Sequence, residues 1–448
     1  MITTKNNEHK KLNFSSEREQ GQACLNSAEH EKNQGRKVLN VPNKREQNQT
    51  CLDSAEREGL RPKGNVPNLR FPEFQGEWER MKFGDIATGF DYGMNAAAKN
   101  YDGVNKYIRI TDIDEASSTY TDKDIVSPDG VLTDNYLVNN RDILLARTGA
   151  STGKSYLYKE SDGKLYYAGF LIRANVTTHD PYFVFSQLHT HRYWRWVSIM
   201  SARSGQPGIN SQEYASFPIY TTSIEEQTKI ASLFRFLDER IATQNKIIED
   251  LKKLKCAIIE KLYSKIQGKE YSYGQLLDVV NERNKQMEYS NILSASQEKG
   301  MVNRDDLNMY IQFERSNINT YKIVRAGDYV IHLRSFQGGF AFSDKQGVCS
   351  PAYTILRPNS LLEHGYLSYY FTSQRFIKSL IIVTYGIRDG RSINVEEWLN
   401  MKVVIPSKEH QLHTLNILKS IDGKIVNEET YATCLSNQKQ YLLRQMFI

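Results

Sequence analysis

The sequence has no long apolar run and few cysteines. Its longest apolar stretches, such as residues 379–384, are far shorter than the roughly 20 residues that a transmembrane helix needs. The N-terminus carries no apolar signal-peptide core. No Cys-x-x-Cys pair occurs among the five cysteines, which are Cys24, Cys51, Cys256, Cys349 and Cys434. We therefore expect a cytoplasmic protein, not associated with a membrane, whose cysteines are reduced and mostly structural.

Recognisable catalytic and metal-binding patterns are also missing. The sequence contains no Gly-x-Ser-x-Gly, His-Glu-x-x-His or Asn-Pro-Pro-Tyr motif, and no nuclease-like carboxylate cluster with a lysine. The close pair His189 and His191 has no carboxylate or cysteine partner in sequence, so no metal site is expected. We predict a binding or scaffolding chain without catalytic residues, metal or cofactor of its own.

One loop resembles a phosphate-binding P-loop without matching it. Residues 149–155 read Gly-Ala-Ser-Thr-Gly-Lys-Ser, with three residues between the glycines where a P-loop has four. Nucleotide hydrolysis is therefore not predicted. The loop remains a candidate for contact with a backbone phosphate, through exposed glycine N–H groups and the charge of Lys154.

The composition is that of an ordinary soluble protein. Apolar residues make up 40% of the 448 residues and charged residues 25%. The net charge of +6 is concentrated near the N-terminus, where residues 1–70 hold 13 Lys and Arg against 9 Asp and Glu. The other 378 residues hold 45 against 43. If this chain binds nucleic acid, its basic residues must gather on one face.

The first 68 residues form a separate region. Much of residues 18–31 recurs 27 residues later in residues 45–58, and Asn-Val-Pro-Asn occurs at residues 40–43 and 65–68. The region is polar and nearly free of aromatic residues, so it cannot bury enough apolar surface to fold alone. We expect a disordered or loosely helical extension over 1–68. A short repeat module that docks on a partner is the alternative.

A long helical pattern occurs twice, with copies 184 residues apart. Apolar residues recur at alternating steps of four and three, the spacing of a coiled-coil seam. The seam positions that we predict are Phe234, Leu237, Ile241, Ile248, Leu251, Ile258, Leu418, Ile421, Ile425, Leu435 and Leu442. The polar interruptions Gln244 and Lys255 coincide with Glu428 and Lys439, and they indicate register-setting positions or partner contacts.

Each helical pattern begins after a serine. Ser223 with Glu226 predicts a capping box, whereas His410 follows Ser407 at the matching place, so only a hydroxyl cap is expected there. The first helix would span about residues 224–265. Pairing the helices within the chain, antiparallel, buries both seams. The alternative is that each helix covers the core of its own domain.

Each helix follows a globular segment of mixed character. We predict strands at residues 107–113 and 142–147 and a helix at 182–200. Landmarks of the first segment recur in the second: residues 83–86 in 273–276, 140–144 in 325–330, and 208–210 in 392–394. The fold class expected is α+β, with two similar mixed α/β domains separated by two long helices in an antiparallel coiled coil.

This plan resembles the specificity subunit of type I restriction-modification systems over residues 65–448. Residues 65–74 (Asn-Val-Pro-Asn-Leu-Arg-Phe-Pro-Glu-Phe) are similar to the opening of staphylococcal-type members of that family. Residues 142–149 with Gly153 and Lys154 are similar to its target-recognition signature, and residues 225–227 to the start of its central helix. The N-terminal repeats depart from the family pattern.

The resemblance implies an organisation and a role. It implies an extension at 1–68, target recognition domains at 69–222 and 269–406, and coiled-coil helices at 223–268 and 407–448. Each domain would read one half of a split, asymmetric DNA sequence. The helices would act as spacer and dock two adenine methyltransferase subunits, joined by two motor-nuclease restriction subunits. S-adenosylmethionine, ATP and Mg²⁺ would then belong to those partners.

Candidate DNA-reading residues are polar or basic groups on the expected loops, because arginine suits bidentate contact with guanine and amides suit adenine. They are Arg147, Thr148, Ser151, Lys154, Arg203 and Gln206 in the first half, and Arg334, Ser335, Gln337, Arg388 and Arg391 in the second. For each of them the alternative is a surface charge or a phosphate contact that carries no sequence information.

Two functions of other classes compete with DNA reading. A coiled-coil scaffold without sequence-specific DNA binding would account for the helices, and an enzyme would show ATPase, nuclease or methyltransferase activity alone. Salt-sensitive binding that prefers one DNA sequence separates the first from DNA reading.

Overall fold

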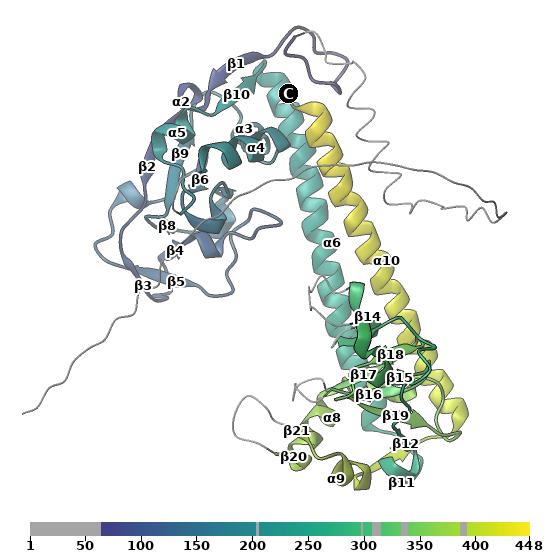
Figure 1. The fold of residues 1–448 in the computed structure, drawn as a ribbon. Coiled ribbons are helices and arrows are strands. Elements are labelled where there is room, and N and C mark those ends of the chain that lie inside the picture. Colours follow the sequence, from purple (N-terminus) through teal and green to yellow (C-terminus); the bar gives the residue numbers. More distant parts are fainter. Residues whose placement is uncertain (1–63, 203–205, 297–298, 307–314, 333–338, 386–391) are drawn as a thin grey trace, which may run out of the picture. The chain divides into compact units, whose positions relative to one another are not determined.

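The computed structural model describes residues 64–202, 206–296, 299–306, 315–332, 339–385 and 392–448. The expected extension at 1–68 therefore lies almost entirely outside the described residues. The described chain contains two halves that share a main sheet and a closing ribbon, each leading into a long helix (Figure 1).

Each half is built around a four-stranded antiparallel sheet of the same topology. The first has the strand order β2-β9-β6-β7 and the second β12-β19-β16-β17. These strands are β2 (Ala87–Tyr92), β6 (Asp142–Ala146), β7 (Ser155–Leu157), β9 (Leu171–Val176), β12 (Leu277–Val280), β16 (Tyr329–Ile331), β17 (Phe340–Phe342) and β19 (Thr354–Pro358).

A two-stranded antiparallel ribbon closes each half by joining its first strand to its last. The ribbons are β1 (Glu79–Lys82) with β10 (Pro218–Thr221), and β11 (Lys269–Ser272) with β22 (Lys402–Ile405). The remaining pairs are β3 (Ala97–Asn100) with β5 (Val126–Asp129), β4 (Lys106–Ile108) with β8 (Leu165–Tyr167), β13 (Leu293–Ser296) with β14 (Gly300–Asn303), β15 (Lys322–Val324) with β18 (Gly347–Cys349), and β20 (Thr384–Tyr385) with β21 (Ser392–Ile393).

Short helices complete both halves. They are α2 (Phe83–Ile86), α3 (Pro181–Gln187), α4 (His191–Met200) and α5 (Ser211–Ala215) in the first, and α7 (Tyr366–Tyr370), α8 (Gln374–Ser379) and α9 (Val395–Asn400) in the second.

The matching landmarks have the same structural role in both halves. Asp142 and Asp328 are buried, and each carboxylate accepts a backbone N–H from the residue three positions earlier. Asn210 and Asn394 cap α5 and α9 through their side-chain oxygens. The sequence landmarks therefore mark turns and caps of one shared fold.

The predicted strand at 107–113 is shorter than expected. β4 ends at Ile108 and a 3₁₀ turn follows at Ile110–Asp112. The buried Asp112 carboxylate accepts the Arg109 backbone N–H at 2.8 Å and also pairs with the Arg109 guanidinium. This local pairing turns the chain where apolar alternation alone suggests a continued strand.

The single helix predicted at 182–200 is also wrong, because two helices occupy the region. α3 ends at Gln187 and α4 begins at His191. Between them, the Thr190 hydroxyl donates to the Gln187 carbonyl and accepts the Tyr193 N–H, which ends one helix and caps the next.

The long helices are α6 (Ile224–Ser264) and α10 (Lys408–Met446), and they lie side by side (Figure 1). Every predicted seam residue is buried or half-buried, as packing between the helices or against the domain cores requires. The helices are antiparallel, because Gln244 contacts Glu428 while Lys255 pairs with Asp422 and Lys439 with Asp238. The fold class expected from the sequence is therefore confirmed.

The two polar interruptions are contacts within the chain. Gln244 and Glu428 hold equivalent positions in the two helices and bond to each other, so a local two-fold axis passes close to them. Lys255 and Lys439 pair with Asp422 and Asp238, which are themselves equivalent. These contacts support the register-setting interpretation.

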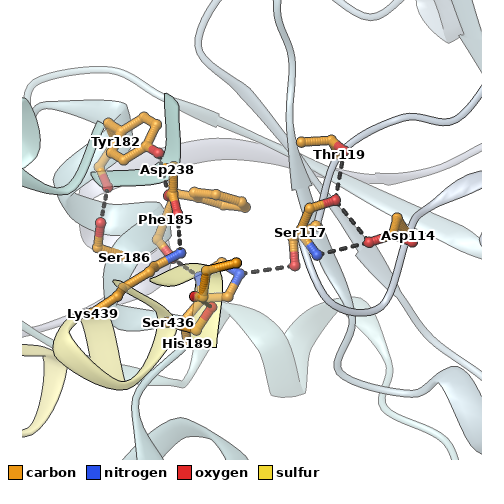
Figure 2. Close-up of polar contacts among 12 residues, drawn as sticks. Asp114, Ser117, Thr119, Tyr182, Phe185, Ser186, His189, Asp238, Ser436 and Lys439 are labelled. Carbon is orange, nitrogen blue, oxygen red and sulfur yellow. Dashed lines mark hydrogen bonds and ion pairs between the residues drawn. The ribbon is translucent and has the colours of Figure 1, made fainter. Parts of the chain in front are cut away.

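Both ion pairs extend to a tyrosine of the adjoining half. The Tyr182 hydroxyl donates to Asp238 at 2.6 Å, and the Tyr369 hydroxyl donates to Asp422 at 2.7 Å (Figure 2 shows the first). Burial, with a smaller contribution from the adjacent carboxylate, raises the pKa of the Tyr182 phenol. Each half is thus tied to the helix pair by the same Tyr–Asp–Lys triad.

The helices also supply core residues to both halves. Phe234 of α6 and Leu443 and Met446 of α10 belong to the core of the first half. Ile259 of α6 and Leu415 of α10 belong to that of the second. The two interpretations of the helices, mutual pairing and coverage of the domain cores, therefore both hold.

The start of α6 differs in one detail from the predicted capping box. The Ser223 hydroxyl accepts the Glu226 N–H at 3.4 Å, as expected. The Glu226 carboxylate turns instead to Arg70, which it binds through two contacts of 2.7 Å, and accepts the Thr222 hydroxyl. The half-buried Arg70 guanidinium outcompetes a backbone N–H for this buried carboxylate. Ser407 caps α10 as predicted, through the His410 N–H.

Among the three described cysteines, only Cys349 has the buried position expected of a structural residue. Burial raises the pKa of its thiol to about 12. Cys256 and Cys434 are exposed on the long helices, so the expectation that most cysteines are structural fails for these two.

Candidate nucleic-acid interface

The loop at 147–154 is the central feature of the candidate site. β6 is completely buried and ends at Ala146, where the chain leaves the sheet before returning as β7. Gly149 and Gly153 have φ values of +71° and +94°, a conformation that favours glycine. A Cβ atom at Gly153 would lie 2.8 Å from Val197 of α4. The two glycines therefore set the shape of this loop.

The expectation that these glycines expose N–H groups to a phosphate is wrong. The Gly149 N–H donates to the Pro207 carbonyl at 3.0 Å. The Gly153 N–H lies within hydrogen-bond distance of the Ala146 carbonyl and of the Tyr214 hydroxyl. Internal acceptors occupy both groups, so neither glycine N–H is available to a phosphate.

Two buried tyrosines support the loop from beneath. The Tyr193 hydroxyl donates to the Gly153 carbonyl at 2.8 Å, and the Tyr214 hydroxyl donates to the Ala146 carbonyl at 2.6 Å. Burial raises the pKa of both phenols, which keeps them protonated as donors. Sequence reasoning missed them because their distance along the chain from the glycine loop hides the contact.

Arg147 is held at the rim of the loop by its backbone and its side chain. Its N–H donates to the Phe170 carbonyl at 3.0 Å, and its carbonyl accepts the Ile209 N–H. The guanidinium lies 4.7 Å from the centre of the Tyr92 ring, and it remains partly exposed. A stacked guanidinium keeps its hydrogen-bond donors at its edges, where they could meet a DNA base or phosphate.

The other predicted residues of the first half differ in accessibility. Thr148 forms a bridge with Gly208, Ser151 is half-buried and Gln206 is exposed. Lys154 pairs with Glu115 at 3.2 Å, and only 18% of its side chain is exposed. Because Glu115 is 85% exposed, this surface ion pair is worth no more than about 1 kcal/mol and could be exchanged for a phosphate. Arg203 lies outside the described residues.

Arg147, Thr148, Ser151 and Lys154 therefore lie on one loop, and backbone contacts join this loop to the segment 206–209. In the second half all five predicted residues, Arg334, Ser335, Gln337, Arg388 and Arg391, lie outside the described residues. Among described basic residues there, Arg325 pairs with Glu282 and Arg357 with Asp328.

Within the described part of the chain, no helix is long and apolar enough to cross a membrane. The same residues contain no group of three or more His, Cys, Asp or Glu side chains placed to hold a metal ion. His189 is engaged in hydrogen bonding: its two ring nitrogens contact the Phe185 carbonyl and the Ser118 hydroxyl at 2.9 and 3.0 Å.

Comparison with known proteins identifies the architecture. A sequence profile described as type I restriction modification DNA specificity domain matches residues 75–253. The type I restriction enzyme MjaVIII specificity subunit of Methanocaldococcus jannaschii is 24% identical over 400 residues, covering 80% of this chain and 88% of that protein. The putative MjaX specificity subunit of the same organism is 22% identical over 390 residues, covering 81% and 90%.

Solved structures share the fold. The S subunit of a type I restriction-modification system from M. genitalium has a TM-score of 0.50 at 13% identity, with 86% of this chain and 99% of that chain covered. A chain from a study of complex assembly and conformational transition of the type I R-M system has a TM-score of 0.52 at 15% identity, with 83% and 97% covered. The chain thus resembles type I restriction-modification specificity subunits in sequence, through the profile over residues 75–253 and the two relatives, and it shares the fold of the solved structures.

Proposed function

We propose that this chain reads a bipartite, asymmetric DNA target on behalf of a type I restriction-modification complex. The observation that carries the proposal is the pair of halves with identical sheet order, tied by equivalent triads to one antiparallel helix pair. A shared scaffold with different loops suits two different half-sites, because base readout resides in loop side chains.

In this proposal residues 69–222 and 269–406 are the two reading domains, and residues 223–268 and 407–448 form the spacer. Residues 1–68 form an extension of undefined role. The first domain reads DNA with Arg147, Thr148, Ser151, Lys154, Arg203 and Gln206, and the second with Arg334, Ser335, Gln337, Arg388 and Arg391. Arg147 is the strongest of these, because its guanidinium is already oriented by Tyr92.

Chemistry in this proposal belongs to partners. Two adenine methyltransferase subunits dock on the helix pair with S-adenosylmethionine, and two restriction subunits add ATP- and Mg²⁺-dependent cleavage, all in the cytoplasm. The local two-fold axis near Gln244 and Glu428 supports two equivalent docking sites, since a symmetric surface accepts two copies of one partner.

The test is to co-express the chain with its cognate methyltransferase and to map methylated adenines across a genome. A split motif with two unlike halves is expected. Absence of any motif, combined with DNA binding that has no sequence preference, contradicts the proposal and favours a scaffold.

A further inference from the structure

The turn between β8 and β9 presents an aromatic ring to solvent. Phe170 directly precedes β9, and 58% of its surface is exposed. Its backbone is fixed: the Phe170 carbonyl accepts the Arg147 N–H at 3.0 Å, and the Gly169 N–H donates to the Met94 carbonyl at 2.8 Å. The turn is therefore rigid, and it keeps the apolar Phe170 ring exposed to solvent. Exposing this ring does not stabilise the fold.

A single exposed phenylalanine is common on protein surfaces and needs no functional explanation. The residues next to Phe170, however, indicate a role in binding. Arg147 joins it to Tyr92, because the arginine backbone bonds to Phe170 while its guanidinium stacks on the tyrosine. Tyr92 is 42% exposed, and its hydroxyl accepts the Ser211 N–H at 3.3 Å. Two exposed aromatic residues are thus joined to Arg147, Tyr92 through the guanidinium and Phe170 through the backbone.

The second half has no aromatic residue at the position that matches Phe170. Leu145 pairs with Ile172 in the first sheet, and the equivalent Ile331 pairs with Thr354 in the second, so Phe170 corresponds to Ala352. The exposed aromatic ring at this turn is therefore particular to the first half, whereas the sheet order is shared.

We propose that Phe170 makes an apolar contact with a base in the half-site that the first domain reads. This inference rests on the proposed function. The matching chemistry on DNA is apolar base surface, either the 5-methyl group of thymine in the major groove or the face of a base that has become unstacked. Arg147, whose backbone N–H bonds to the Phe170 carbonyl, supplies attraction to the DNA, and the fixed turn avoids loss of backbone freedom on binding.

The experiment uses the complex reconstituted with its methyltransferase and the duplex defined by the methylation map. Phe170→Ala is expected to weaken binding to that duplex about 10-fold, as loss of one base contact does. Binding to an unrelated duplex should change less than twofold. Val279→Ala, which removes an exposed apolar side chain from β12, outside the loops proposed to read DNA and outside the docking helices, is the control and should leave both affinities unchanged.

Two further arms distinguish the source of the apolar surface. If the contact is a thymine methyl, replacing one thymine by uracil weakens binding by the wild-type complex about threefold and leaves the Phe170→Ala complex indifferent. If the contact is an unstacked base, 2-aminopurine at that position brightens when the wild-type complex binds but not with Phe170→Ala. Phe170→Leu should then retain only the methyl contact, and Phe170→Tyr should retain stacking.

Methylation by the Phe170→Ala complex is the control for folding. If the complex still methylates a motif with an intact second half, its first domain is folded. Unchanged target affinity in a folded Phe170→Ala complex, or an equal loss on target and unrelated DNA, overturns this inference. Absence of any motif from the wild-type complex instead contradicts the proposed function.

Discussion

The Tyr182–Asp238–Lys439 triad allows a quantitative prediction about how the first half is fixed to the helix pair. In Asp238→Ala the Tyr182 hydroxyl loses its acceptor at 2.6 Å, and Lys439 loses its counter-charge. Tyr182 is only 8% exposed, so an unpaired hydroxyl costs about 1–3 kcal/mol. The ion pair, with side chains 17% and 30% exposed, adds about 1 kcal/mol. We expect a total loss of about 2–4 kcal/mol.

Three companion variants separate these contributions. Asp238→Asn keeps an acceptor for Tyr182 and should lose only about 1 kcal/mol. Lys439→Met combined with Asp238→Ala gives a double-mutant cycle whose coupling energy should be about 0.5–1 kcal/mol and should shrink in high salt. Asp422→Ala is the matched change in the second half, and it should cost less because the Asp422 side chain is 37% exposed.

The measurement is urea denaturation followed by tryptophan fluorescence and circular dichroism. Trp78, Trp194 and Trp196 report on the first half and Trp398 on the second, so the transition affected by each variant can be assigned. The reasoning is refuted if Asp238→Asn is as damaging as Asp238→Ala while the cycle shows no coupling, because neither contact would then contribute as argued.

Three other predictions follow from features of the described chain. Burial and the nearby Lys439 lower the pKa of His189 to about 4; because the unfolded chain then binds more protons, stability should fall as pH drops from about 6.5 toward 4, and His189→Asn should flatten that slope in acid denaturation curves. A thiol reagent should label Cys256 and Cys434 in the folded chain but reach Cys349 only on unfolding, and rapid labelling of all three, read by peptide mass spectrometry, would contradict the structure. Inserting one heptad into both α6 and α10 preserves the seam and should lengthen the gap in the methylated motif, whereas an unchanged gap argues against a spacer role.

The seam was predictable from sequence because coiled-coil packing depends on local periodicity. Phe234, Leu237 and their counterparts recur at fixed steps, and a partner helix of similar length is present in the same chain. The similarity of the two sheets could be predicted only from matching short segments, such as those that contain Asp142 and Asp328. The strand predicted at 107–113 and the helix predicted at 182–200 were too long. Asp112 and Thr190 end these elements, because their side chains form hydrogen bonds with nearby backbone groups.

The candidate site was less predictable. The sequence singled out Arg147 and Lys154 as basic residues on a loop, and the structure places both at the rim of that loop. The sequence could not reveal that Tyr92 orients Arg147 or that Glu115 pairs with Lys154. Nor could it reveal that the Tyr214 hydroxyl accepts the Gly153 N–H. All three contacts join residues that are distant in sequence. Long-range contacts of this kind leave no periodic signal.

The core of the first half includes residues from both ends of the described chain. Trp78 contacts Phe447 ring to ring, and the Leu69 N–H donates to the Gln445 carbonyl. Phe183 and Phe234 also contact Phe447. During synthesis these partners emerge only after the whole second half and nearly all of α10, so the first half cannot follow the usual N-terminal-first order of folding. Its exposed core would then need protection in the cell, and contacts of such long sequence separation predict that its last step is slow.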